Sequence, residues 1–258
     1  MCLLVVASRV RGDLPLVVGA NRDELVTRPA SPMEVLRAES PRVIGGRDML
    51  GGGTWLAANV HGVIAAITNQ PERHDPTKRS RGELPLALTQ EVSAMTAVDR
   101  FATRFRPSDF NPAWITVADR DTLFSIDMTG DDQPEVVEIG AGIHVFENCP
   151  PGTDSPKITH VRSRLIGFDA LPAPTVVPLL TETLADHVPS SPPAPPDQRH
   201  TGEEPATLCA PCVHANRYGT RWSAVVTVGN SPQPPTLLYA DGPPCETDFT
   251  DATPYWRE

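Results

Sequence analysis

The chain begins with MCLLVVASRVRGDLPLVVGANRDE (residues 1–24), in which two short apolar runs precede a polar cluster. The runs, Cys2–Ser8 and Leu14–Ala20, are separated by a polar five-residue segment, so the pattern predicts a β-hairpin. In a hairpin the end of the second strand returns beside the start of the first. We therefore expect Asn21–Glu24, directly after the second strand, to lie close to Cys2.

Cys2 is small enough for the initiator methionine to be removed, which would make it the first residue of the mature chain. Its α-amine, with a pKa of about 8, is a usable base at neutral pH and can activate the thiol of the same residue. The neighbouring Arg22 would favour the thiolate, and a carboxylate of the cluster would orient the amine or thiol. The alternatives are a buried apolar cysteine at a strand start and a solvated turn with a surface ion pair.

The remaining patterns predict an α+β protein with largely antiparallel sheets. Residues 20–53 are rich in proline and glycine and are expected to be loop. Further strands are expected at 54–60, 63–68, 114–118, 122–127, 135–139, 143–147, 221–228 and 235–240, and helices at 84–92, 94–105, 155–168 and 175–188. Because strands come in hairpins and helices cluster in the middle, we expect two sheets face to face with helices outside, in a single domain over residues 1–258.

Composition excludes several classes of function. The net charge of −10 argues against a nucleic-acid partner, which needs a basic face, and no apolar run is long enough for a membrane span. No basic region precedes the apolar start, so the protein is expected to be cytoplasmic, with its five cysteines reduced. Residues 189–205 are proline-rich and predict a mobile surface excursion. Only Lys78 and Lys157 among 22 basic residues are lysines, which we interpret as compositional bias.

Three other constellations have chemical potential. The glycines at 45–53 suggest a phosphate loop, but Gly52 and Gly53 stand where Lys and Ser or Thr are required, so close backbone approach is preferred. Asn69 and Asn148 each follow an apolar strand, where an amide can donate to an oxyanion or simply begin a turn.

The third constellation is the segment Cys209-Ala210-Pro211-Cys212-Val213-His214, with His200 upstream. A single C-x-x-C lacks its partner pair, and its histidine spacing fits neither a zinc finger nor a haem attachment site. We therefore predict no metal.

Taken in order, a set of short motifs resembles the NRDE family, also called the transport and Golgi organisation protein family of the second type. The motifs span residues 1 to about 230: Met1-Cys2, Asn21-Arg22-Asp23-Glu24 with Arg28-Pro29, Gly46-Arg47-Asp48, Gly52-Gly53-Thr54-Trp55-Leu56, Ile67-Thr68-Asn69, Ser80-Arg81-Gly82 and Tyr218-Gly219-Thr220-Arg221. The resemblance implies an N-terminal-nucleophile (Ntn) hydrolase fold, a four-layer αββα sandwich related to choloylglycine hydrolases and penicillin V acylase. It also implies a catalytic set of Cys2, Arg22, Asp23, Asn69, Asn148 and Arg221, with Glu24 as the alternative carboxylate.

Two functions are compatible with these observations. The first is a Cys-type amidohydrolase or acyltransferase that acts on a small-molecule amide or thioester through an acyl-enzyme on Cys2, without a cofactor. The alternative, also implied by the resemblance, is a non-catalytic carrier of haem, lipid or acyl-CoA, in which Cys2 or a histidine would ligate haem iron. The sequence favours the hydrolase and does not name the acyl group, the leaving group or the oligomeric state.

Overall fold

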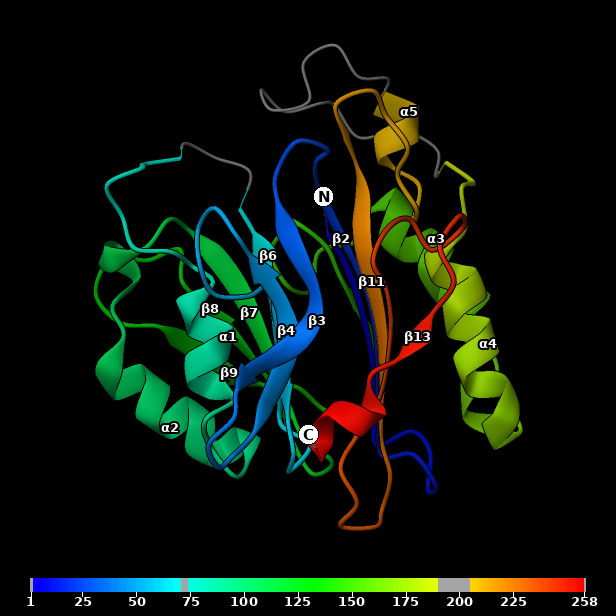
Figure 1. Cartoon of the computed structure of the whole chain (residues 1–258), viewed down its shortest axis with the longest axis horizontal. Coiled ribbons are helices and arrows are strands. Elements are labelled where there is room, and N and C mark those ends of the chain that lie inside the picture. The colour runs from blue at the N-terminus through cyan, green and yellow to red at the C-terminus, as the bar shows by residue number, and fades with distance from the viewer. Residues whose placement is uncertain (1, 71–73, 190–204, 258) are drawn as a thin grey trace.

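Two antiparallel β-sheets stack face to face, and helices cover their outer faces (Figure 1). The computed structural model describes residues 2–70, 74–189 and 205–257. Within these residues the elements follow the predicted α+β order, and the arrangement confirms the predicted fold class. Met1 and nearly all of the proline-rich segment, residues 190–204, lie outside the described residues.

Sheet A carries the first hairpin. Its strands, in spatial order, are β10 (Gly142–Phe146), β1 (Leu3–Ser8), β2 (Leu16–Leu25), β11 (Tyr218–Val228), β12 (Thr236–Ala240) and β13 (Thr250–Asp251). The β1–β2 pairing places Leu3 opposite Asn21 and Ser8 opposite Leu16, as an antiparallel hairpin requires.

Sheet B is built by strands that are neighbours in the sequence. It runs β3 (Ala30–Arg37), β4 (Val43–Asp48), β5 (Leu56–Asn59), β6 (Ile64–Asn69), β7 (Ala113–Ala118), β8 (Leu123–Asp127) and β9 (Glu135–Glu138). The expectation that residues 20–53 form loop is wrong, because they contain the end of β2 and the whole of β3 and β4.

Two helices cover each sheet. Helices α1 (Glu83–Leu88) and α2 (Ala94–Arg104) lie on sheet B, α3 (Pro156–Arg164) and α4 (Ala173–Leu184) lie on sheet A, and a short α5 (Pro205–Leu208) precedes β11. The 3₁₀ turns are η1 (Pro107–Asp109), η2 (Phe168–Ala170) and η4 (Thr253–Trp256). Ser155 caps α3 by accepting a hydrogen bond from the Ile158 N–H, with Pro156 in the first turn. No helix in the described part of the chain is long and apolar enough to cross a bilayer.

The core divides into three layers that follow from strand alternation. One face of each sheet packs against the other sheet, around Leu4, Ile44 and Trp222. The opposite face of sheet B packs on α1 and α2, and the opposite face of sheet A packs on α3 and α4. This is the four-layer αββα sandwich, and it places the start of β1 at one end of the space between the sheets.

Candidate active site

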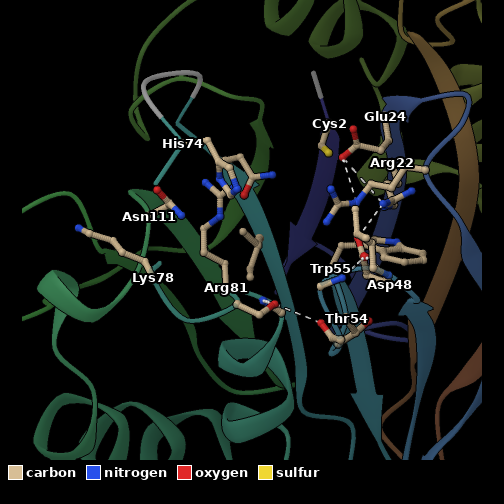
Figure 2. Close-up of a pocket in the computed structure, with 18 of the residues that line it drawn as sticks. Cys2, Arg22, Glu24, Asp48, Thr54, Trp55, His74, Lys78, Arg81 and Asn111 are labelled. Atoms are coloured by element: carbon tan, nitrogen blue, oxygen red, sulfur yellow. Dashed lines mark hydrogen bonds and ion pairs between the residues drawn. The ribbon is translucent and has the colours of Figure 1, made fainter. Parts of the chain in front are cut away.

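Cys2 lies immediately before β1 and lines a pocket at the end of the sandwich (Figure 2). Continuing the β1–β2 register by one residue places Cys2 opposite Arg22. The thiol Sγ lies 3.9 Å from the backbone oxygen of Asp23. Burial raises the pKa of the Cys2 thiol and the Asp23 carboxylate acts in the same direction, whereas the Arg22 guanidinium lowers it. A thiol in this position needs a neighbouring base to become a nucleophile.

The polar cluster that follows the first hairpin belongs to β2 itself, not to a loop after it. Because side chains alternate along a strand, Asn21 and Asp23 point to the opposite face from Arg22 and Glu24. Asn21 donates to the backbone oxygens of Leu184 and Pro211 on the helical side. Arg22 instead reaches sheet B, so a single strand supplies polar groups both to the helix layer and to the space between the sheets.

Arg22 is held in place by groups from sheet B. Its Nη2 donates to Oδ2 of Asp48 at 3.0 Å, and its guanidinium carbon lies 4.3 Å from the centre of the Trp55 ring. Arg22 is 4% exposed, and its Nη1 has no hydrogen-bond partner among the described residues. Nη1 is also shielded from solvent, so Arg22 contributes a fixed, buried positive charge beside Cys2.

Asp48 is the anion that fixes this arginine. Oδ2 also accepts from Nε of Arg28 at 2.7 Å, while Oδ1 accepts from the backbone N–H groups of Leu50 and Gly51. Burial alone would raise the pKa of Asp48, but the hydrogen bonds from Arg28 and Gly51 outweigh it, and the pKa lies below its ordinary value. Asp48 therefore remains ionised opposite two arginines.

Asp23 is buried on the other face of β2. Its Oδ1 accepts from the Thr220 hydroxyl at 2.6 Å, and Oδ2 lies 3.8 Å from Nζ of Lys157, which is 2% exposed. Burial raises the pKa of Asp23, partly offset by Lys157 and Thr220. Glu24, the alternative carboxylate, instead lies 3.8 Å from Arg22 and 3.9 Å from Arg28. Of the two, Asp23 has its backbone oxygen beside the Cys2 sulfur and belongs to the buried network.

The two asparagines meet at Cys2. The backbone N–H of Cys2 donates to Oδ1 of Asn148 at 2.5 Å, and Nδ2 of Asn148 donates to the backbone oxygen of Asn69. Asn148 follows β10 in sheet A, whereas Asn69 ends β6 in sheet B. Both ends of the Asn148 amide are thus engaged, and Asn69 is one of the residues that line the pocket.

Arg221 is placed elsewhere. The β2–β11 pairing shifts register between Thr220, opposite Asp23, and Trp222, opposite Arg22. Arg221 is the extra residue of this bulge and its side chain is exposed, outside the pocket lining. The structure therefore brings together five of the six implied catalytic residues and leaves Arg221 apart.

The pocket has a volume of about 550 Å³ and two unlike walls. Figure 2 shows Cys2, Arg22, Glu24 and Asp48 on one side, facing His74, Lys78, Arg81 and Asn111 on the other. Its lining includes five Lys or Arg residues and two acidic residues of the same wall: Arg22, Arg28, Lys78, Arg79 and Arg81 against Glu24 and Asp48. Asp23 also borders the pocket, but its carboxylate is buried on the other face of β2. A chain of net charge −10 thus concentrates positive charge at this pocket.

Glycines shape the pocket floor, as the preference for close backbone approach predicted. Gly53 has a φ of +78°, and a Cβ there would lie 2.3 Å from the backbone carbon of Gly82. The Thr54 N–H donates to the Gly82 oxygen at 3.0 Å, which ties the two loops together. Only a residue without a Cβ permits this contact.

Sequence reasoning missed Asp48, Lys157 and the wall around Lys78 as site residues. Asp48 is part of the Gly46-Arg47-Asp48 motif, and that motif could have identified it as a site residue. The rarity of lysine is a weaker indication for Lys78 and Lys157. The only two lysines of the chain both lie at this site, but their small number was interpreted as compositional bias.

Comparison with known proteins adds a family. A sequence model of the family described as Transport and Golgi organisation 2 matches residues 1–234. The mouse (Mus musculus) Transport and Golgi organization 2 homolog is 27% identical over 229 residues, which cover 83% of this chain and 82% of that protein.

Solved structures support the fold. A variant of the conjugated bile acid hydrolase from Clostridium perfringens superimposes with a TM-score of 0.58 at 12% identity, covering 97% of this chain and 92% of that one. The Caenorhabditis elegans ortholog of N-acylethanolamine-hydrolyzing acid amidase gives 0.54 at 14% identity, covering 87% and 92%. At these identities the likeness shows the Ntn-hydrolase fold alone. Because the family match extends over most of its length, the chain belongs to the Transport and Golgi organisation 2 family.

Proposed function

We propose that this protein is an N-terminal-cysteine amidohydrolase or acyltransferase that cleaves an amide or thioester after removal of Met1. The observation that carries the proposal is the position of Cys2. Its sulfur lies at a pocket, its nitrogen is held by Asn148 at 2.5 Å, and the buried Arg22 and Asp23 flank it. Amine, thiol and charge-stabilising donors at one point are the parts that acyl transfer requires.

In the proposed reaction the Cys2 sulfur attacks the substrate carbonyl carbon while the thiol proton passes to the α-amine of the same residue. The developing oxyanion accepts a hydrogen bond from the Asn69 amide, and the buried guanidinium of Arg22 adds a stabilising positive charge beside Cys2. The C–N or C–S bond then breaks, and the ammonium returns the proton to the leaving amine or thiol. Water, or an acceptor amine, attacks the resulting thioester and restores the thiol.

Asn148 has a different task in this scheme from that of Asn69. Its Oδ1 accepts from the Cys2 nitrogen and its Nδ2 is already engaged with Asn69, so it orients the amine rather than binding the oxyanion. Asp23 and Lys157 set the charge behind the nucleophile. Arg221, exposed on the bulge, has no role in the mechanism.

The opposite wall favours a substrate with an anionic group. His74, Lys78 and Arg81 line the wall opposite Cys2, away from the reacting sulfur (Figure 2). A carboxylate, sulfonate or phosphate on the substrate could form charge-assisted hydrogen bonds with Lys78 and Arg81. A wholly apolar ligand would form none, so the charged lining favours the hydrolase over a carrier of apolar molecules.

The experiment compares two preparations of the same chain. In one, an uncleavable N-terminal tag precedes Cys2. In the other, protease removal of the tag leaves Cys2 as the first residue. We expect only the second preparation to hydrolyse a panel of acyl amides and thioesters, and we expect Cys2→Ala to abolish this turnover. Cys149→Ala is the matched control, because Cys149 is also half-buried, and it should retain turnover. Equal activity of the tagged chain, or of Cys2→Ala, would refute the role of the α-amine or of the thiol.

The anionic preference is tested separately. Lys78→Gln should raise KM for an anionic substrate by about tenfold with kcat unchanged, since one charge-assisted hydrogen bond is lost. A neutral analogue should show no change, and neither should Arg104→Gln, an exposed arginine outside the pocket lining. An equal rise in KM for both substrates would contradict the assignment. Saturable binding without turnover in all preparations would favour the carrier.

A further inference from the structure

Four potential metal ligands converge at a second place, beside sheet A. They are His187, just after α4, Cys212 and His214, between α5 and β11, and Cys245, between β12 and β13. One ligand atom from each side chain, Nδ1 or Nε2 of histidine or Sγ of cysteine, lies within 4.8 Å of all the others. These residues come from three segments separated in the sequence, so chain folding alone assembles the cluster.

The distances match a tetrahedral centre. Sγ of Cys212 lies 3.7 Å from Sγ of Cys245. With a zinc–sulfur bond of about 2.3 Å, two thiolates at the tetrahedral angle stand about 3.8 Å apart. A disulfide requires about 2.05 Å, so the observed separation is that of two ligands and not of a bond. Nε2 of His214 lies 3.1 Å from the Cys245 sulfur, about half an ångström less than the roughly 3.6 Å between a nitrogen and a sulfur ligand of one tetrahedral zinc ion.

Groups around the histidines orient them as metal ligands are usually oriented. Nδ1 of His214 lies 3.9 Å from the Glu246 carboxylate, which leaves Nε2 toward the cysteines. Nδ1 of His187 lies 3.3 Å from the backbone oxygen of Cys212, which leaves Nε2 for an ion. The two imidazole rings are 4.9 Å apart. Each histidine thus has Nδ1 toward an oxygen at the periphery and Nε2 available at the centre.

We propose that His187, Cys212, His214 and Cys245 bind one Zn²⁺ ion in a Cys₂His₂ site. Two thiolates and two imidazoles in a tetrahedral arrangement select zinc among the common divalent ions. A divalent ion would balance the negative charge of two thiolate ligands at one point.

This ligand set differs from the one that the sequence suggested. The C-x-x-C motif points to Cys209 and Cys212, yet Cys209 is not part of the cluster, and the second thiolate comes from Cys245, 33 residues further along. His200 lies outside the described residues. The C-x-x-C motif alone therefore selects the wrong partner for Cys212. The four ligands lie on separate segments, which is why their spacing in the sequence matches no usual zinc finger.

The ion would fix the loop behind the candidate nucleophile. The Val213 N–H donates to the Thr220 hydroxyl, and that hydroxyl donates to Asp23. The Cys212 N–H donates to the Asp186 oxygen after α4. Zinc at this place would hold the end of α4, the segment before β11 and the β12–β13 loop together, in a structural role separate from the reaction at Cys2.

The test measures metal directly. Protein purified in reductant without added metal or histidine tag should contain about one zinc ion per chain by elemental analysis. After chelation, Co²⁺ titration should give the visible absorption of a tetrahedral site together with a thiolate-to-cobalt charge-transfer band. Cys245→Ser, at an exposed position, should fold normally by circular dichroism and lose both signals.

Cys209→Ser is the matched control because it removes the other cysteine of the motif. It should keep the zinc and the cobalt spectrum. In Cys245→Ser, the loss of one thiolate ligand should weaken zinc binding by more than about a hundredfold, because changing a residue that only supports the metal ligands already weakens metal binding by up to that factor. No stoichiometric zinc or cobalt binding by the wild type, equal metal loss in Cys209→Ser, or a Cys212–Cys245 disulfide in the reduced preparation would each overturn the proposal.

Discussion

Asp48→Asn tests whether the Arg22–Asp48 contact holds the two sheets and the site in register. Asp48 Oδ2 accepts hydrogen bonds from Arg22 at 3.0 Å and Arg28 at 2.7 Å, and the Arg22 side chain is buried. Removing one partner of a buried ion pair costs about 3–5 kcal/mol. The Arg28 side chain is 30% exposed and adds little, so we expect a loss near the lower end, about 3 kcal/mol of unfolding free energy.

The measurement is urea unfolding at neutral pH, with the melting temperature as a second readout. A loss of that size should lower the melting temperature by about 6–12 °C in a chain of this length. Glu34→Gln is the matched control, because Glu34 pairs with Arg47 at 2.5 Å across the neighbouring strands β3 and β4, but both side chains are more than a third exposed. Its cost should stay below about 1 kcal/mol.

The pH dependence follows from the lowered pKa of Asp48. A carboxyl whose folded pKa lies below its unfolded value contributes stability above the unfolded pKa, about 3.9, and loses it as the pH falls through the folded value. The difference between wild type and Asp48→Asn should therefore be constant from about pH 8 to 5 and shrink below about pH 4. Equal costs for the two variants at neutral pH would refute the reasoning.

Three further changes probe neighbouring features. Gly53→Ala should lower the free energy of unfolding in urea by at least about 2 kcal/mol, because its Cβ would overlap the backbone of Gly82. Gly152→Ala is the control, since Gly152 also has a positive φ but open space around it, and it should cost about 1 kcal/mol. Equal costs would contradict the close approach. The destabilisation caused by Lys157→Met should become smaller as the pH falls, because burial raises the pKa of Asp23 and a protonated Asp23 no longer needs the cation. Urea unfolding over a pH series measures it, and a pH-independent cost would contradict the pair. Burial raises the pKa of Cys149 to about 11. The alkylation rate of Cys149, measured by peptide mass spectrometry, should therefore rise about tenfold per pH unit from pH 7 to 10. A plateau within that range would contradict the raised pKa.

The architecture could be predicted from alternation and turn signals, but β3 and β4 could not. Proline in a strand pattern argues against a strand, yet Pro32 lies in β3, the edge of sheet B, where a missing N–H is tolerated. The glycines of β4 are also not loop glycines. A Cβ at Gly45 would meet the backbone oxygen of Leu56, and one at Gly46 would meet the Trp55 ring. Glycine therefore allows close packing in β4, although the same residue type is also typical of turns.

The candidate site likewise contains residues that could be predicted from the sequence and residues that could not. The hairpin alone predicts that Cys2 meets the polar end of β2, and the family resemblance supplies Asn69 and Asn148. Lys157 could not be predicted, because its approach to Asp23 depends on how α3 packs on sheet A. The ligand pairing of Cys245 with Cys212 depends likewise on contacts between distant segments. Local pattern places residues along a strand, whereas long-range packing decides which of them meet.

The site also explains why a sandwich suits this chemistry. Cys2 directly precedes β1 and Arg22 lies in β2 of sheet A, whereas Asp48 lies in β4 and Trp55 directly precedes β5 of sheet B. The charged environment of the sulfur therefore exists only when the sheets close. Trp55 meets Trp222 of sheet A edge-on at 5.2 Å, which extends the same contact into the core. Arg22 is thus both part of the inter-sheet packing and the fixed cation beside the proposed nucleophile. Under the proposed function we therefore expect a change at Asp48 to lower stability and turnover through one cause, and a change at Cys2 to remove turnover while leaving the packing of the sheets intact.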